Sequence, residues 1–235
     1  MKKLLFLLLL FNAFLSNSFP QELNELYSKA YQAYLEKDYA KASEYFSSFR
    51  KDYQLHDELL ASAIYYQAES FSYSGQNDEA IIAYSYLINN FTYSNFRDKA
   101  TYKTGLLYYE KKSYENAQDF FLQLNKKYPD NEFYGSTLYW IGETYARQNN
   151  IEEAINYFKE AISYKQSNKF IDNSIYSLAR TYEDLGDYTN AVTYYDELLS
   201  YYKESPLASQ AQIRLGICYF KLKQYDSSML ELSDP

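Results

Sequence analysis

The stretch LYWIGETYARQNNIEEAINYFKEA, residues 138–161, holds two amphipathic segments on either side of a short polar turn. Gly142 and Tyr145 are three residues apart, and Ala154 and Phe158 are four apart, so each pair shares one face of a helix. Small residues let two helix backbones approach closely, and aromatic rings fill the space that remains. The stretch therefore predicts a helical hairpin.

The same pattern recurs along the chain. One column of small residues, spaced by 38 residues once and by 37 thereafter, consists of Ala42, Ala80, Ala117, Ala154, Ala191 and Ser228. Twelve positions before each of these stand Ala30, Ala68, Gly105, Gly142, Ala179 and Gly216. Four positions after each stand Phe46, Tyr84, Phe121, Phe158, Tyr195 and Leu232. One hairpin cannot bury its own apolar face, so six such units are expected to stack into an all-α, right-handed superhelix, or solenoid.

Short polar turns separate the two halves of a unit. They read SGQND at 74–78, RQNN at 147–150 and DLGD at 184–187, with Gly and Asn well placed to end a helix. We expect a solenoid over residues 22–235, preceded by a separate segment at 1–18. Its units span residues 22–56, 57–93, 94–130, 131–167, 168–204 and 205–235, and the last unit is incomplete.

Composition limits the functions open to this chain. Tyrosine occurs 31 times and aromatic residues make up 20% of the sequence, against only 6 Gly and 4 Pro, which indicates helices packed through aromatic faces. The formal net charge of −8 makes a nucleic-acid partner unexpected, because such binding depends on Lys and Arg to neutralise phosphate. The single cysteine, Cys218, excludes an intrachain disulfide.

The N-terminus has the order of a secretory signal peptide. Lys2 and Lys3 precede an apolar run over 4–15, which is followed by small polar residues. A run this short falls below the roughly 20 residues needed to cross a bilayer. We expect cleavage after Ser18, export, and no stable membrane insertion afterwards. An uncleaved, partly buried anchor is the alternative.

The repeated order of small residue, tyrosine, turn, alanine and aromatic residue resembles the tetratricopeptide repeat (TPR), although its period is 37 residues instead of the usual 34. Residues 126–161 and 204–228 resemble repeats of exported bacterial TPR proteins. Those proteins are the Tol–Pal-associated periplasmic cell-division coordinator and the TPR lipoprotein of the outer-membrane β-barrel assembly machine. The resemblance implies a non-enzymatic scaffold that binds a protein or peptide in the periplasm of a Gram-negative-type bacterium, in envelope assembly or division.

The chain departs from both of these families. The cell-division coordinator carries a coiled-coil segment before its repeats, whereas the first repeat here starts close to the expected cleavage site. The assembly lipoprotein needs a lipid-bearing cysteine, and none lies near that site. Neither function is therefore carried over whole.

Candidate catalytic residues have packing explanations. Trp140 lies two positions before Gly142, where a core or groove position is expected. Glu152 and Glu153 begin the second helix of their unit, where acids interact favourably with the helix dipole. His56 and Cys218 are the only histidine and cysteine, which leaves no expected zinc set. We therefore expect no catalytic residue, no cofactor and no metal.

One column suggests a binding surface. Three residues before the small position of the first helix stand, in the first five units, Tyr27, Tyr65, Tyr102, Tyr139 and Tyr176, and Ile213 takes this place in the last unit. In the TPR family this column faces the concave surface, where partners bind, and tyrosines offer flat aromatic area with hydroxyl groups. The neighbouring concave column adds variable side chains for specificity, among them Tyr31, Leu106, Glu143 and Arg180. The alternative is that the tyrosines pack between neighbouring helices.

The last unit is short. Its second helix is expected to start near Tyr225 and to stop at Ser233, which leaves an apolar end without the polar capping helix that repeats usually carry. The short helix could seal this end, the chain could be part of a longer repeat protein, or two copies could pair there. A structural or self-association module is therefore the alternative to a partner-binding scaffold.

Overall fold

A computed structural model describes residues 21–164 and 168–233. Within these residues the chain forms twelve α-helices and no strand, which confirms the all-α fold class. The predicted signal peptide, residues 1–18, lies outside the described residues.

The helices are of two alternating kinds. The first helix of each hairpin, here called an A helix, is α2 (Gln21–Leu35), α4 (Glu58–Tyr73), α6 (Arg97–Glu110), α8 (Tyr134–Arg147), α10 (Ile171–Asp184) or α12 (Ala208–Lys221). The second, here called a B helix, is α3 (Tyr39–Asp52), α5 (Asn77–Asn90), α7 (Tyr114–Lys127), α9 (Ile151–Ser163), α11 (Tyr188–Tyr201) or α13 (Tyr225–Ser233).

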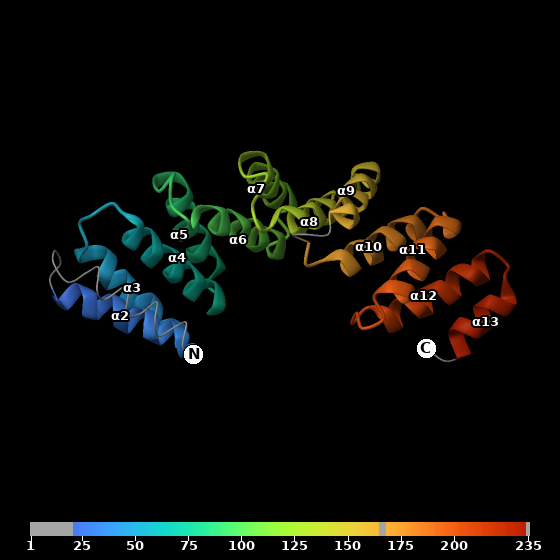
Figure 1. Cartoon of the computed structure of the whole chain (residues 1–235), viewed down its shortest axis with the longest axis horizontal. Coiled ribbons are helices and arrows are strands. Elements are labelled where there is room, and N and C mark those ends of the chain that lie inside the picture. The colour runs from blue at the N-terminus through green and yellow to red at the C-terminus, as the bar shows by residue number, and fades with distance from the viewer. Residues whose placement is uncertain (1–20, 165–167, 234–235) are drawn as a thin grey trace. The chain divides into compact units, whose positions relative to one another are not determined.

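The chain divides into two compact units, with the division between Thr104 and Gly105 inside α6. In the first unit α2 packs on α3, α3 on α4, and α4 on α5. In the second unit each helix from α7 to α13 packs on the next (Figure 1). Packing between consecutive helices is typical of a TPR solenoid, since each repeat contacts only its neighbours.

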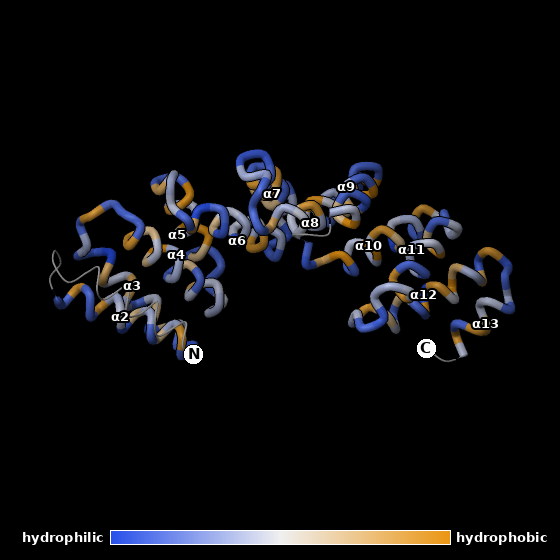
Figure 2. The backbone as a smooth tube through the Cα atoms, in the orientation of Figure 1, coloured by the Kyte–Doolittle hydropathy of each residue, from blue (hydrophilic) through white to orange (hydrophobic). Residues whose placement is uncertain are grey.

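The apolar face of each hairpin forms the core. Orange and blue alternate along the helices in Figure 2, as expected for helices that bury one face. Both columns of small residues and the aromatic column are buried, and solvent does not reach Phe46, Tyr84, Phe121, Phe158 or Tyr195. Leu232, the last member of the aromatic column, differs in being 44% exposed. The predicted packing columns are therefore correct, except at this position in the last hairpin.

The A-to-B turns share one backbone conformation. Each contains a residue with positive φ at the same repeat position, namely Lys37, Gly75, Lys112, Asn149, Gly186 and Lys223. The N–H of the following residue donates to the carbonyl five residues earlier, as Asn150 does to Tyr145 at 2.9 Å. This hydrogen bond closes the A helix in a Schellman motif, which requires a left-handed residue.

The B-to-A connections also repeat. A polar side chain accepts a backbone N–H two residues later at Asp57, Ser94, Asn131, Asn168 and Ser205. Asp57 also accepts from the N–H of Leu60 and so caps α4. These short polar links fix the start of each following A helix.

Candidate binding surface of the A helices

The five tyrosines of the predicted binding column lie largely inside the protein. Tyr65, Tyr102 and Tyr139 are each 8% exposed, and Tyr27 and Tyr176 are half-buried. Aromatic residues at the start of the following A helix cover two of these rings. Phe170 stacks on Tyr139 at a centroid distance of 5.0 Å, and Phe96 lies 4.9 Å from Tyr65.

The polar ends of this column also contact neighbouring helices. The hydroxyl of Tyr27 lies 2.8 Å from Oγ of Ser62, and Nε of Arg214 donates to the hydroxyl of Tyr176 at 3.1 Å. Burial raises the pKa of Tyr27 to about 12, so its hydroxyl stays protonated at neutral pH. The rings therefore take part in packing, and a role in partner binding stays a prediction.

Glu143 of the neighbouring column links three A helices. Its Oε2 accepts from the hydroxyl of Tyr109 on α6 at 3.0 Å, and its Oε1 accepts from Oγ of Ser177 on α10 at 2.6 Å. Arg147 lies one turn away, with Nη2 3.9 Å from the carboxylate. Burial, followed by the charge of Glu143, raises the pKa of Tyr109 to about 12, so this hydroxyl remains a donor.

Glu69, at the same repeat position in the first unit, has similar contacts. It accepts from the hydroxyl of Tyr34 on α2 at 3.4 Å, and Nζ of Lys103 on α6 lies 3.1 Å from its Oε1. The buried hydroxyl of Tyr84 on α5 donates to Oε1 as well. A carboxylate at this position therefore connects the preceding and following A helices in both units.

Arg180 replaces the carboxylate in α10. Its Nε lies 3.8 Å from Glu183 and its Nη2 lies 3.5 Å from Asp184, and its side chain is 33% exposed. Glu183 in turn accepts two hydrogen bonds from Nη1 of Arg214, at 3.0 and 3.1 Å. Tyr31 stacks beside Tyr27, while Leu106 is half-buried. The predicted specificity column is thus partly exposed, with Glu143 held by hydrogen bonds and Arg180 by ion pairs.

Sequence reasoning missed the column that joins successive A helices. It lies one position after the tyrosine column and consists of Tyr66, Lys103, Trp140, Ser177 and Arg214. Each contacts the preceding A helix, as Trp140 does when its ring lies 5.0 Å from that of Tyr109. The constant spacing of 37 residues was a usable signal, but the five residue types share no chemistry that would reveal a common role.

Each residue considered for catalysis has surroundings that explain it without a reaction. Glu152 and Glu153 are exposed in the first turn of α9, and Trp140 packs among aromatic rings. Cys218 is fully buried, and burial followed by the charge of Glu183 raises its pKa to about 12, which keeps the thiol protonated. His56 stacks on Phe91 with ring centroids 4.0 Å apart.

Two further features concern ligands and membranes. Across the described parts of the chain, no three His, Cys, Asp or Glu side chains gather in a way that could hold a metal ion. None of the helices within 21–164 and 168–233 is long and apolar enough to cross a membrane.

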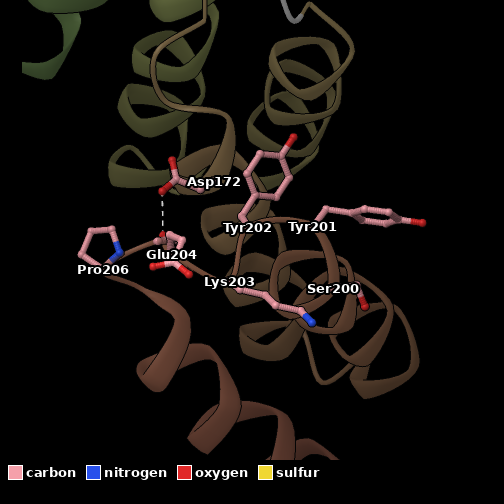
Figure 3. A pocket seen from close by; sticks show the side chains of 8 residues that line it. Asp172, Ser200, Tyr201, Tyr202, Lys203, Glu204 and Pro206 are labelled. Carbon is pink, nitrogen blue, oxygen red and sulfur yellow. Dashed lines mark hydrogen bonds between the residues drawn. The ribbon is translucent and has the colours of Figure 1, made fainter.

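An open depression of about 500 Å³ lies beside the loop between α11 and α12. Oγ of Ser205 donates to Oδ2 of Asp172 at 2.6 Å on one side of it (Figure 3). Tyr201 and Lys203 extend away from that pair, and Tyr201 is 80% exposed. Oγ of Ser205 also accepts the backbone N–H of Leu207, so this pair belongs to the link that begins α12, and the depression has the character of a loop surface.

Comparison with known proteins agrees with this architecture. Models of the tetratricopeptide repeat match residues 62–92, 99–131, 135–168 and 176–232. No curated protein sequence matches the chain. A tetratricopeptide repeat protein from Parabacteroides merdae is similar in structure, with a TM-score of 0.70 and 18% identity over 91% of this chain and 78% of that one.

A MamA structure from Desulfovibrio magneticus is also similar, with a TM-score of 0.67 and 12% identity over 80% of this chain and 99% of that one. At these identities the likeness concerns the fold alone. The family models and the register of buried columns, turns and helices lead to one conclusion: the chain belongs to the tetratricopeptide repeat family.

Proposed function

We propose that this protein is an exported, non-enzymatic scaffold that binds a protein or peptide of the cell envelope through its A helices. TPR folds are interaction scaffolds that bind along extended surfaces. Residues 1–18 support export because they have the order of a signal peptide, and export from a Gram-negative-type bacterium would place the scaffold in the periplasm. A role in envelope assembly or division rests on the resemblance to exported TPR proteins.

The observation that carries the proposal is the fixed position of Glu143. Its hydrogen bonds to Tyr109 and Ser177 hold the carboxylate between two neighbouring A helices before any partner arrives. A surface whose polar groups are already ordered loses less conformational entropy on binding. Arg180, one repeat later and a third exposed, places the opposite charge at the same repeat position.

Photo-cross-linking tests this surface. The photoreactive residue p-benzoylphenylalanine would replace Leu106 in one variant and Arg180 in another, with Asn156, exposed on α9, as the matched control position. We expect one envelope protein to cross-link from the two A-helix positions and not from Asn156. The purified partner should then bind Arg180→Glu at least tenfold more weakly than wild type. Equal cross-linking from all three positions would contradict the proposal.

Export is tested separately. We expect the protein in the periplasmic fraction to begin after Ser18, as N-terminal sequencing would show. Protein retained in the cytoplasm with Met1 intact would refute export, and the A-helix experiment would still stand on its own.

A second candidate is a structural module that packs against another helical element. The observation that favours it is the apolar surface of the last hairpin, which includes Phe220, Met229 and Leu230 at 58%, 67% and 72% exposure. If this candidate is correct, Met229→Glu combined with Leu230→Glu should abolish association, while Arg180→Glu leaves it unchanged.

A further inference from the structure

The outer face of α5 differs from the outer faces of the other B helices. Ile82 is 69% exposed and Tyr86 is 44% exposed, and they lie one turn apart on the same face. At the repeat position of Ile82, the other B helices carry Glu44, Asp119, Asn156, Thr193 and, in α13, Leu230. At the position of Tyr86, four of them carry Ser48, Gln123, Glu160 and Glu197.

This contrast argues that the pair is not a requirement of the fold. Four B helices form with polar residues at the position of Ile82, so the repeat does not need an apolar side chain there. Exposed isoleucine on a helix gains nothing from water, whereas a contact that covers it removes apolar area from solvent. We call Ile82 and Tyr86 the α5 patch.

Opposite charges flank the α5 patch. Glu79 lies one turn before Ile82 and is exposed. At the other end, the guanidinium of Arg50 on α3 lies 5.5 Å from the centre of the Tyr86 ring and donates to Gln67. The patch is therefore negative toward the start of α5 and positive toward its end.

Such a patch is complementary to itself. If two α5 helices meet with opposed directions about a twofold axis, Ile82 of each copy lies against Tyr86 of the other. Glu79 of each copy then comes beside Arg50 of the other, so both ends are matched in charge. An apolar pair with charges of one sign would not have this property.

We propose that the α5 patch is a self-association surface, and that its partner is a second copy of this chain in a twofold, antiparallel pairing of α5. It is separate from the A-helix positions proposed to bind another protein. Two apolar side chains and one ion pair per copy make an interface smaller than the standard, which is about 800 Å² per partner. The dimer is therefore weak.

Sedimentation equilibrium of the purified protein tests the pairing, at concentrations up to about 1 mM because the interface is small. We expect the weight-average mass to rise with concentration toward that of a dimer, and to rise less at high salt because salt screens the ion pairs. Ile82→Glu should weaken association at least tenfold, and Tyr86→Gln should have a similar effect. Circular dichroism should show both variants folded, since both side chains are exposed.

Two controls separate this surface from others. Thr193→Glu makes the matched change on α11 and should leave association as in wild type. Met229→Glu with Leu230→Glu alters the exposed apolar residues of α13 and should also leave it unchanged. A protein that stays monomeric throughout, an unaltered dimer in Ile82→Glu, or a dimer lost only in the α13 variant would each overturn the proposal.

Discussion

The second and fourth hairpins fill the space between their A and B helices in different ways. In the fourth, Gly142 on α8 lies so close to Phe158 on α9 that a Cβ atom at position 142 would come within 2.7 Å of the ring. In the second, the same two positions hold Ala68 and Tyr84, and the Tyr84 hydroxyl donates to the buried carboxylate of Glu69. The fourth hairpin therefore depends on the close approach of its two helices, and the second depends on a buried hydrogen bond.

The difference shows that a tyrosine in the aromatic column requires a second residue nearby. Wherever the aromatic column holds tyrosine, a nearby carboxylate accepts its hydroxyl, because a buried hydroxyl without a partner is costly. Glu69 accepts the hydrogen bond from the Tyr84 hydroxyl, and Glu183 accepts one from the Tyr195 hydroxyl at 2.8 Å. The two carboxylates occupy different repeat positions, so the requirement is for an acceptor and not for a particular site.

Among the changes predicted here, alkaline pH should have the largest effect on stability, because it acts on every buried tyrosine hydroxyl. Burial and the charge of Glu69 raise the pKa of Tyr84 well above its ordinary value, so the folded protein keeps this hydroxyl protonated. Unfolded tyrosine ionises near pH 10, so above about pH 10 the unfolded state binds fewer protons than the folded state. Stability present below this pH is lost as the pH rises, and Tyr34, Tyr65 and Tyr139 contribute in the same direction.

Circular dichroism and tyrosinate absorbance, followed together, measure this effect. We expect the buried tyrosines to ionise together with unfolding, in one transition above pH 10. The double variant Tyr84→Phe, Glu69→Leu removes one ionising hydroxyl. It should therefore unfold at a higher pH than the wild-type protein. Ionisation of all tyrosines near pH 10 without loss of helix would contradict the account.

Removing Glu69 should be the most damaging single substitution. Glu69→Leu leaves the buried hydroxyl of Tyr84 without its acceptor and Lys103 without its ion pair. Breaking a buried pair costs about 3–5 kcal/mol, and we expect about 3 because Lys103 is one-third exposed and can reach water. Denaturant unfolding measures the loss.

Two variants check the cause of that loss. Glu152→Ala, at an exposed position, should stay within about 0.5 kcal/mol of wild type. Adding Tyr84→Phe to Glu69→Leu removes donor and acceptor together and should recover much of the stability. If the double variant is no more stable than Glu69→Leu alone, the hydroxyl is not the source of the cost.

A methyl group should disturb the fourth hairpin less. In Gly142→Ala, the new Cβ meets Phe158, and overpacking of this kind costs about 1–3 kcal/mol. Alanine gains about 1 kcal/mol over glycine in a helix, so we expect a net loss of about 1 kcal/mol. Thermal unfolding should show the loss, and Phe158→Leu in the same background should reduce it by making room for the methyl. A more stable Gly142→Ala protein would show that Phe158 moves freely.

The fold was predictable from the sequence because the same packing pattern recurs in every repeat. The columns of small and aromatic residues fix one face of every helix, and the left-handed turn positions at Gly75, Asn149 and Gly186 have residue types that suit them. Lys37 and Lys112 adopt the same conformation without such a sign. Their conformation follows from the repeat position alone, since the A helix must end at the same point in every hairpin.

The candidate binding surface was less predictable because it depends on contacts between repeats. Tyr65 and Tyr139 look like exposed aromatic groups when one helix is considered, but Phe96 and Phe170 of the following repeats cover them. The hydrogen bonds of Glu143 likewise join three helices that are far apart in sequence. A period gives the spacing of these residues, but it does not give the distance between one helix and the next.

The turns between the A and B helices offer the only single substitution expected to stabilise the folded protein. Lys112 has φ of 60°, a left-handed conformation that costs a residue with a Cβ about 1–2 kcal/mol. Lys112→Gly should therefore stabilise the protein by about 1 kcal/mol, after allowing for the loss of a favourable charge at the end of α6. Gly186→Ala makes the reverse change at φ of 77° and should destabilise by a similar amount. Denaturant midpoints that move in opposite directions for these two variants would show that one backbone conformation is required in both turns, whatever residue occupies it.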